Sequence, residues 1–336
     1  MTPQSRSPPI SRRSRSRIIF LLSGESTSLP AAEASALVRM QDRDATFESP
    51  ENRVLIASSD ADPERIAGRI AFSKRVGSML PDGRLDGDQL RSLRKGTYRV
   101  SVFDLGEKKP DSQRLVSELA SRIGGRVSLT HPDQEVMILR GRKDYFALTR
   151  PAAMRQAWVI RRPRARPFFH PAAIFPKLSR ALVNLSRVDS GKVFLDPFCG
   201  TGSLLLEAYE FGARVIGADR DARMVRGALQ NMAGFGQEWL GVIRADIGNL
   251  PVAVVDGIAT DIPYGRASTT SGQGAIGMME RLLRSAAGVL REGTRLVVMH
   301  PKTVPVRSKQ NFEVEEEHHL YIHSKLTRTI SVLRRL

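Results

Sequence analysis

From Lys192 onward, short apolar runs alternate with segments of helical periodicity. The runs that predict buried strands are 192–195, 214–217, 240–244, 252–260 and 294–299, and the helical segments are 203–211, 222–232 and 277–290. Such alternation is typical of a parallel sheet with helices on both faces. Two final alternating runs, 312–317 and 319–332, predict an antiparallel pair of strands at the sheet edge. Residues 176–336 should therefore form a doubly wound α/β domain.

Four successive strands of this pattern each end at an acidic residue: Asp196, Asp219, Asp246 and Asp261. The carboxyl ends of parallel strands meet at one edge of a sheet, where open α/β folds bind their ligands. A carboxylate after the second strand can accept hydrogens from both ribose hydroxyls. One after the third strand can bind an adenine amino group while Ile247 packs on the ring. The acids therefore predict a site for an adenosine ligand.

The turn between the first strand and the first helix reads DPFCGTG, from Asp196 to Gly202. Glycines in such a turn allow a ligand to approach the backbone closely. The lysine of a P-loop is missing, and Leu205 stands where a dinucleotide fingerprint needs its third glycine. The ligand expected here is therefore an adenosine compound without a pyrophosphate. We interpret Cys199 as a small turn residue, because no base partner is evident.

The fourth acid opens the segment Asp261-Ile262-Pro263-Tyr264, which follows a buried strand and is stopped by the proline. The carboxylate and a carbonyl of the turn can accept the hydrogens of a planar amine while the tyrosine ring stacks on a base. Taken alone, the segment could equally be a β-turn with an incidental acid and tyrosine. With the other three acids it predicts an amine-binding loop opposite the adenosine site.

The charge of the chain favours a polyanionic partner. The net charge is +17, and basic residues gather without acids in residues 1–17, in residues 155–187 and toward the C-terminus. Solvated surface charge usually mixes both signs, so the unmixed blocks indicate an electrostatic surface for RNA or DNA. A single cysteine favours a reducing cytoplasm, and no apolar run is long enough to cross a membrane.

The region before the α/β domain carries no catalytic constellation. Residues 1–17 predict a disordered basic tail, residues 18–150 an α+β binding region, and residues 151–175 a linker rich in proline, arginine and aromatic residues. The elements expected in the α+β region are strands at 18–22, 54–57 and 98–103, helices near 29–37, 62–71 and 113–123, and a hairpin of 136–140 with 145–148. The linker could also contact RNA through its arginines and aromatics.

Several motifs resemble one enzyme family. The tetrad at Asp261 is similar to the Asp/Asn-Pro-Pro-Tyr motif of enzymes that methylate exocyclic amines. RPFFHP at 166–171, PKL at 176–178, ALVNL at 181–185 and the ending HSKLTR at 323–328 resemble the archaeal THUMP-domain tRNA guanine-10 N2-methyltransferases and their eukaryotic relatives. FLLSGE at 20–25 is similar to the start of their ferredoxin-like domain. The resemblance extends from about residue 18 to the C-terminus.

This resemblance implies a Rossmann-like, seven-stranded, S-adenosylmethionine-dependent methyltransferase domain at 176–336, preceded by a ferredoxin-like and THUMP RNA-binding module. It implies N2-methylation of guanosine 10 in cytoplasmic tRNA, with no metal, no membrane and no obligate protein partner evident. The implied catalytic residues are Asp261, Pro263 and Tyr264. The implied cofactor-binding residues are His170, Asp196, Phe198, Gly200, Gly202, Asp219, Arg220, Asp246, Ile247 and Asp261.

Ile262 departs from the family motif, which has a proline there; a side chain pointing away from the substrate should tolerate the change. Methylation of another guanosine in tRNA or rRNA remains open, as does the choice between one and two methyl groups. DNA adenine and protein glutamine methyltransferases share the tetrad, but they would not need the N-terminal module. An RNA-binding protein with a vestigial site is a further alternative, against which the intact acids count.

Overall fold

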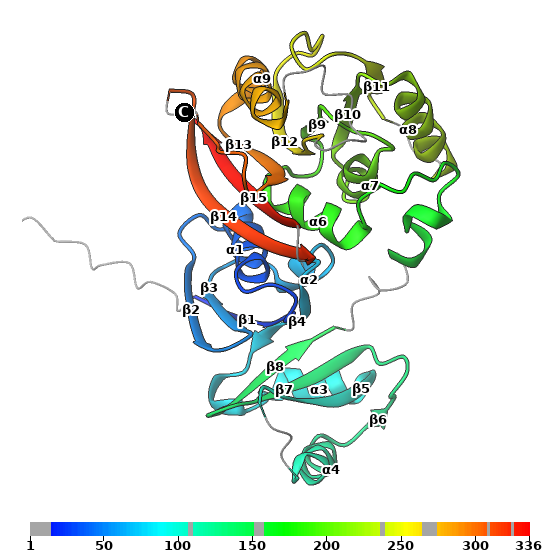
Figure 1. Cartoon of the computed structure of the whole chain (residues 1–336). Coiled ribbons are helices and arrows are strands. Elements are labelled where there is room, and N and C mark those ends of the chain that lie inside the picture. The colour runs from blue at the N-terminus through cyan, green and yellow to red at the C-terminus, as the bar shows by residue number, and fades with distance from the viewer. Residues whose placement is uncertain are drawn as a thin grey trace, which may run out of the picture.

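Two separate sheets organise the chain (Figure 1). The computed structural model describes residues 15–106, 110–150, 158–235, 239–263, 274–307, 310–323 and 326–336. In these residues an eight-stranded sheet has the order β2-β3-β1-β4-β8-β7-β5-β6, and a seven-stranded sheet has the order β11-β10-β9-β12-β13-β15-β14. Most of the predicted basic tail lies outside the described residues, as does the first part of the predicted linker.

The N-terminal sheet is built from β1 (Arg17–Leu22), β2 (Thr46–Glu51), β3 (Val54–Ser58), β4 (Ser73–Met79), β5 (Thr97–Asp104), β6 (Arg126–Val127), β7 (Gln134–Arg140) and β8 (Asp144–Thr149). Its helices are α1 (Leu29–Gln41), α2 (Pro63–Ala67), α3 (Gly87–Lys95) and α4 (Ser112–Ile123), with a 3-10 turn η1 (Pro81–Gly83). In Figure 1, β1–β4 with α1 and α2 lie between the C-terminal domain and the part formed by β5–β8, α3 and α4. The α+β prediction is confirmed.

The sequence interpretation missed β2, β4, β6 and α3. The segment TFESPE of β2 is largely polar and contains a proline, and SKRVGSM of β4 buries only Val76 and Gly77. Helix α3 buries a single residue, Leu93. Elements with so little buried apolar surface leave a weak periodic signal, and pairing with neighbouring strands decides their structure.

The C-terminal sheet contains β9 (Val193–Asp196), β10 (Arg214–Asp219), β11 (Gly241–Arg244), β12 (Val255–Asp261), β13 (Leu290–Pro301), β14 (Phe312–His323) and β15 (Leu326–Arg335). Its helices are α6 (Pro176–Leu185), α7 (Ser203–Tyr209), α8 (Ala222–Gly234) and α9 (Gly274–Val289), preceded by a 3-10 turn η2 (Pro163–Ala165). Strands β9 to β13 pair in parallel, whereas β15 and β14 are antiparallel. The predicted doubly wound sheet with its edge hairpin is confirmed.

One predicted boundary in this hairpin is wrong. A single strand was expected over 319–332, but β14 continues to His323, β15 begins at Leu326, and His319 pairs with Thr329. Alternation continues through both strands, and neither glycine nor proline marks the turn. Apolar pattern alone therefore placed the turn several residues too early.

Side chains of the central strands alternate between two cores. Ile258 of β12 packs with α9 on one face, and Ala259 packs with α6 and α7 on the other. Asp261 follows Ala259 by two residues and so shares its face, because successive side chains of a strand point to opposite sides. The strand thus directs this acid toward α6.

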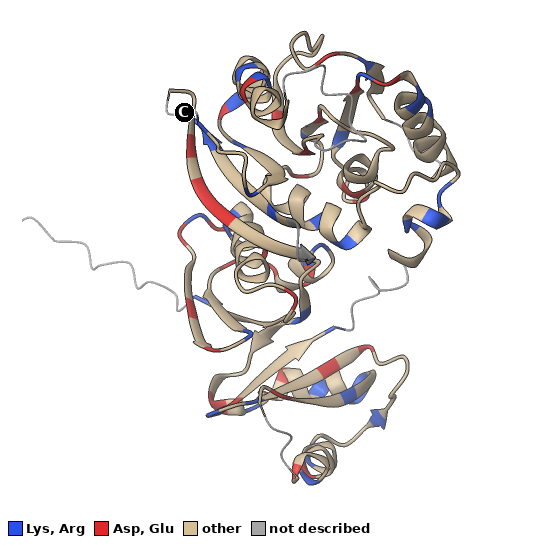
Figure 2. Cartoon of the chain, in the orientation of Figure 1, with Lys and Arg blue, Asp and Glu red and all other residues tan. Residues whose placement is uncertain are grey.

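The block 155–187 is not an exposed basic surface throughout, which corrects the sequence interpretation. Arg161, Arg166 and Arg180 are only 3%, 5% and 2% exposed. The carboxylate of Glu207, which is fully buried in α7, accepts hydrogen bonds of 2.8 Å from Nε of both Arg161 and Arg180. Figure 2 places basic residues near α6 and α7 and a run of acids along β14. A count of charges could not distinguish these buried arginines from solvated ones.

A buried polar network joins the N-terminal part to the C-terminal domain. Nδ2 of Asn184 in α6 donates to Oε1 of Glu33 in α1 at 2.7 Å, and Oδ1 of Asn184 accepts from Nε of Arg69 at 2.8 Å. Oε2 of Glu33 also accepts the N–H of Phe72 at 2.7 Å. Arg69 reaches the carbonyl of Val188 at 2.5 Å. These contacts fix the two parts against each other.

Replacing Asn184 with Leu should destabilise the protein by about 1–3 kcal/mol for each buried group that loses its partner, chiefly Glu33 and Arg69. Denaturant unfolding of the full chain measures this change. The matched control is Asn52→Leu at an exposed turn, where an effect within about 0.5 kcal/mol is expected. Equal unfolding midpoints for the two variants would contradict the role given to the network.

Candidate active site

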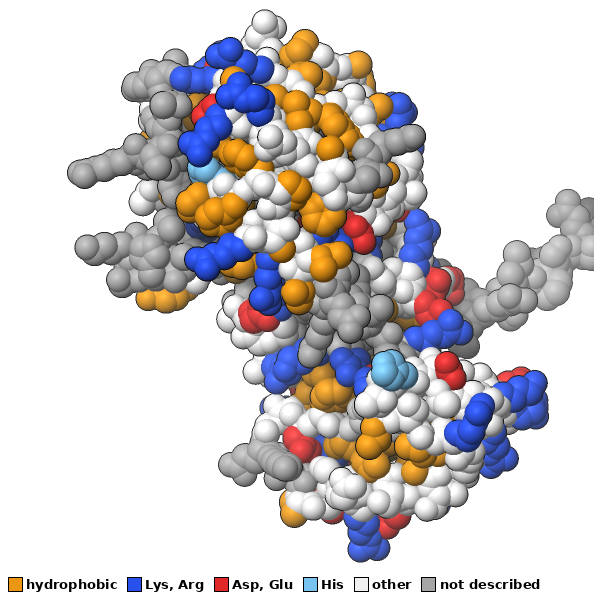
Figure 3. All heavy atoms as spheres, turned by 90° about the vertical axis from the view of Figure 1, so that its right-hand side faces the viewer, with side chains coloured by type: hydrophobic (Ala, Val, Ile, Leu, Met, Phe, Trp, Pro, Cys, Tyr) orange, Lys and Arg blue, Asp and Glu red, His pale blue; other side chains and the backbone are white. Residues whose placement is uncertain are grey.

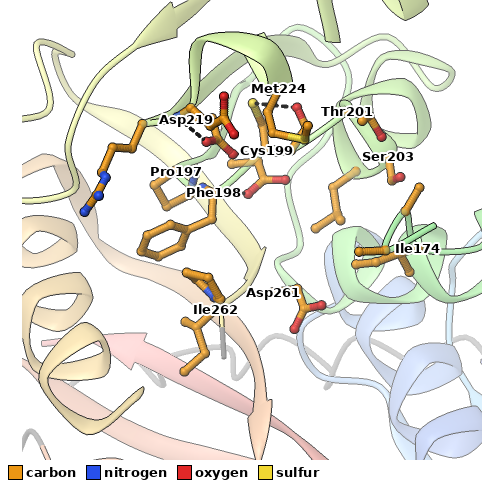
Figure 4. A pocket seen from close by; sticks show the side chains of 18 of the residues that line it. Ile174, Pro197, Phe198, Cys199, Thr201, Ser203, Asp219, Met224, Asp261 and Ile262 are labelled. Atoms are coloured by element: carbon orange, nitrogen blue, oxygen red, sulfur yellow. Dashed lines mark hydrogen bonds between the residues drawn. The ribbon is translucent and has the colours of Figure 1, made fainter. Parts of the chain in front are cut away.

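A pocket of about 400 Å³ opens at the carboxyl ends of β9, β10 and β12. It brings together nearly all the sites expected from the sequence: His170, Asp196, Phe198, Gly200, Asp219, Arg220, Asp246, Ile247, Asp261 and Pro263. Figure 4 shows Asp219 and Asp261 on opposite sides of this space. Gly202 is not part of the wall, and Tyr264 lies outside the described residues.

Asp196 organises the turn after β9. Its side chain is almost completely buried, and its Oδ1 accepts a hydrogen bond from the Thr260 hydroxyl at 2.7 Å and from the Phe198 N–H at 3.2 Å. Burial raises the pKa of the Asp196 carboxyl to about 7. Because Thr260 directly precedes Asp261, this acid also braces the strand end that carries the fourth acid.

Asp219 holds the glycine turn from the end of β10. Its Oδ2 accepts the N–H of Gly200 at 2.9 Å, its Oδ1 accepts the N–H of Asp221 at 2.8 Å, and burial raises its pKa. Gly200 has φ +51° and Gly202 has φ +83°, left-handed conformations that favour glycine. Gly202 is the N-cap residue that precedes α7 and lies near Ala228, so its contribution is to backbone geometry.

Asp246 and Ile247 form the next part of the wall. Asp246 is partly exposed, accepts the N–H of Gly248 at 2.9 Å and pairs with Arg281 of α9. Ile247 is buried, and its carbonyl accepts a hydrogen bond from the Ser285 hydroxyl. The wall thus offers a carboxylate next to an apolar surface, an arrangement suited to an adenine edge and face.

Asp261 presents two different oxygens. Its Oδ2 accepts a hydrogen bond of 3.0 Å from Nη1 of Arg328, whereas its Oδ1 is buried with no hydrogen-bond partner in the part of the chain that the structure describes. Burial raises the pKa of this carboxyl to about 6, and the neighbouring Arg328 opposes that rise. A buried acceptor without a partner costs free energy, so this oxygen is suited to receive a donor from a ligand.

Ile262 takes part in both the core and the pocket wall, so the expectation that its side chain points away from the substrate stays a prediction. Ile262 is fully buried and belongs to the core formed with Met278 of α9. His170 lies at the pocket edge, where its Nδ1 accepts the N–H of Ala172 at 3.3 Å.

Sequence reasoning missed three residues that shape the site: Thr260, Arg281 and Arg328. Arg328 was noted only as part of a family-like C-terminal motif. Strand β15 also carries threonines, a serine and two further arginines, so no local pattern sets Arg328 apart from its neighbours.

Comparison with known proteins gives a family. The profile of a family described as "RMKL-like, methyltransferase domain" matches residues 163–330. The tRNA (guanine(10)-N2)-dimethyltransferase of Methanothermobacter thermautotrophicus is 32% identical, over 95% of this chain and 99% of that protein. The enzyme of the same name from Methanocaldococcus jannaschii is 29% identical, over 94% and 99%. The chain belongs to the tRNA (guanine(10)-N2)-dimethyltransferase family. The predicted family resemblance is confirmed.

A solved structure agrees with this membership at the level of the fold. TrmN from Thermus thermophilus has a TM-score of 0.52 and 21% identity, covering 95% of this chain and all of that one. Membership in the dimethyltransferase family implies S-adenosylmethionine as the methyl donor. The pocket fits such a group: an open glycine turn, two partly accessible carboxylates and a buried apolar wall line one side. No helix in the described part of the chain has the length and apolar character to cross a membrane.

Proposed function

We propose that this protein transfers methyl groups from S-adenosylmethionine to the N2 amine of guanosine 10 in cytoplasmic tRNA. The observation that carries the proposal is Oδ1 of Asp261, which has no hydrogen-bond partner among the described residues and belongs to a side chain across the pocket from Asp219. One side of the site is thus suited to an adenosine donor and the other to an amine. The names of the relatives that span nearly the whole chain support this substrate.

The proposed cofactor contacts follow the order of the strands. His170, Asp196, Phe198 and Gly200 would hold the methionine side, Asp219 and Arg220 the ribose, and Asp246 with Ile247 the adenine. Gly202 would act indirectly, by fixing the turn. When bound, the cofactor supplies an electrophilic methyl group. Asp246 would exchange part of its contact with Arg281 for the adenine amine, since that pair is partly exposed.

The amine side rests on Asp261 and Pro263. The lone pair of guanine N2 is conjugated into the ring, so this nitrogen is a weak nucleophile. Oδ1 of Asp261 would accept one amine hydrogen, favour a pyramidal nitrogen and take up the proton that leaves during transfer. The carbonyl of Pro263 would accept the second hydrogen, and Tyr264, outside the described residues, would stack on the base.

The N-terminal part would bind the tRNA as a ferredoxin-like and THUMP module. Its rigid attachment through Asn184 supports this division, because a fixed distance between binding module and active site can select one nucleotide. On the face in Figure 3, apolar side chains gather over the C-terminal domain with lysines and arginines around them, a mixture that suits bases and phosphates. The target base would have to leave its helix to reach the pocket.

The deciding experiment supplies labelled cofactor and unmodified tRNA to the full-length protein, followed by mapping of the labelled nucleoside. The matched control is the same tRNA with inosine at position 10, which lacks only the N2 amine. We expect label in N2-methylguanosine at position 10 and none in the inosine transcript. A time course separates one methyl group from two. Label at another guanosine would favour a different RNA site, and label in adenosine, or none, would refute the proposal.

A further inference from the structure

Arg328 reaches the site from a strand that is not adjacent to β12. Asp261 of β12 pairs with Met299 of β13, which pairs with Ile330 of β15. Arg328 stands two residues before Ile330 and so points to the same face of the sheet. Its Nη1 lies 3.7 Å from the sulfur of Met299 and 3.0 Å from Oδ2 of Asp261. The guanidinium therefore spans β13 to reach the acid.

This contact makes the two oxygens of Asp261 unequal. Arg328 takes Oδ2, and the side chains of the pair are only 24% and 19% exposed. Oδ1 lies buried without a partner among the described residues. A terminal carboxylate rotates easily about its last bond, and a charge-assisted hydrogen bond to one oxygen fixes the direction of the other.

We propose that Arg328 is a positioning residue for methyl transfer, which holds Oδ2 of Asp261 so that Oδ1 faces the amine of the target base. This inference rests on the proposed function and deepens it. A loosely held carboxylate would meet the amine in many orientations, and a misplacement of about 1 Å can cost on the order of 100-fold in rate. The arginine contacts neither proton nor methyl group in this role; it acts through Asp261.

Arg328 also favours the ionised form of Asp261. Burial raises the pKa of Asp261 to about 6, and the charge and hydrogen bond of Arg328 oppose a larger rise. The other acidic and basic side chains around the pocket are those of His170, Asp196, Asp219, Arg220, Asp221 and Asp246. Of the charged neighbours, Arg328 is the one that lowers the pKa of Asp261. Without Arg328, the pKa of Asp261 should rise further, so a larger share of the acid would be protonated and unable to accept the amine proton.

The test measures kcat/KM for tRNA against pH in the wild type, Arg328→Gln and Arg328→Lys. In the wild type the rate should fall on the acid side near pH 6, the pKa given by the structure for Asp261. In Arg328→Gln the pH at which the rate falls on the acid side should rise by about 1–3 units, the usual effect of an adjacent arginine on the pKa of an aspartate. The rate at pH 7 should drop about 10- to 100-fold. Arg328→Lys, which keeps the positive charge, should return the pH of this acid-side fall most of the way to the wild-type value.

Arg334→Gln is the matched control, since Arg334 lies on the same strand but pairs with Glu313 and Glu315 away from the pocket. It should leave both rate and pH profile unchanged. Cofactor affinity, followed by calorimetry, should be the same in all four proteins. If the rate of Arg328→Gln falls at the same acid pH as that of the wild type, or if weaker cofactor binding explains its rate loss, the positioning role is overturned.

A second readout does not depend on catalysis. Carboxyl-labelled aspartate allows the pKa of Asp261 to be followed by NMR, with the resonance assigned by its absence in Asp261→Asn. The pKa should rise in Arg328→Gln and return in Arg328→Lys; equal values in all proteins would refute the coupling. If the wild type fails to methylate guanosine but this shift appears, the proposed function is wrong while the coupling stands. If the wild type is active and no shift appears, the inference alone fails.

Discussion

Asp261→Asn should reduce methyl transfer by about 10²- to 10⁴-fold, the usual contribution of a positioned general base. Asparagine keeps the shape of the side chain but cannot take up a proton at neutral pH. The amide nitrogen of asparagine is a hydrogen-bond donor. It would replace either the acceptor Oδ1 or the Oδ2 that accepts a hydrogen bond from Arg328. Cofactor binding should persist, because Asp261 lies across the pocket from Asp219. Single-turnover rates with full-length tRNA and cofactor titrations measure the two effects separately.

The chain offers a close control on the same strand. Asp256 is also an acid of β12 paired with an arginine: its Oδ1 lies 3.1 Å from Nε of Arg291, and its side chain is 16% exposed, against 19% for Asp261. It stands at the opposite end of β12 from the pocket. Asp256→Asn should therefore retain methyl transfer. Similar rate losses in the two variants, or loss of cofactor binding in Asp261→Asn, would contradict the assignment.

The acids of the site could be predicted because they depend on strand order alone. In a parallel sheet all carboxyl ends lie at one edge, so acids at four successive strand ends must converge. Asp196, Asp219, Asp246 and Asp261 all line the same pocket. Their division into turn-holding and ligand-facing groups could not be read from the sequence. Asp196 accepts hydrogen bonds from Thr260 and Phe198, whereas one carboxylate oxygen of Asp261 has no hydrogen-bond partner within the described chain.

Arg328 illustrates what sequence could not provide. Its meeting with Asp261 depends on the register of two strand pairs, β12 with β13 and β13 with β15. A shift of one residue in β15 would direct Arg328 to the opposite face of the sheet. The sequence interpretation also placed the turn before β15 wrongly, so no register could be derived. Long-range pairing, and not local pattern, completes the site.

The buried arginines lead to the largest expected effect on stability. Glu207→Gln should destabilise the protein by about 3–5 kcal/mol, because it leaves buried guanidinium groups without their counter-charge. Arg161 and Arg180 each donate to Glu207 from positions that are 3% and 2% exposed. Arg166, whose pKa burial lowers to about 10, lies in the same cluster and donates to the Ser203 hydroxyl at 2.7 Å. Denaturant unfolding of the full-length chain measures the loss.

Glu210→Gln is the control, since Glu210 follows Glu207 by one helical turn and pairs with the same Arg161 at 3.2 Å, but is 38% exposed. A partly exposed pair contributes about 1 kcal/mol or less, so this variant should unfold close to the wild type. The cluster also supports the pocket, because Arg166 is held by the Arg161 carbonyl at 2.9 Å just before the segment that carries His170. Glu207→Gln should therefore weaken cofactor binding as well as stability. Equal stability of the two variants would show that the buried charges are compensated by other groups, and that the arginine-rich segment does not depend on Glu207 for its position.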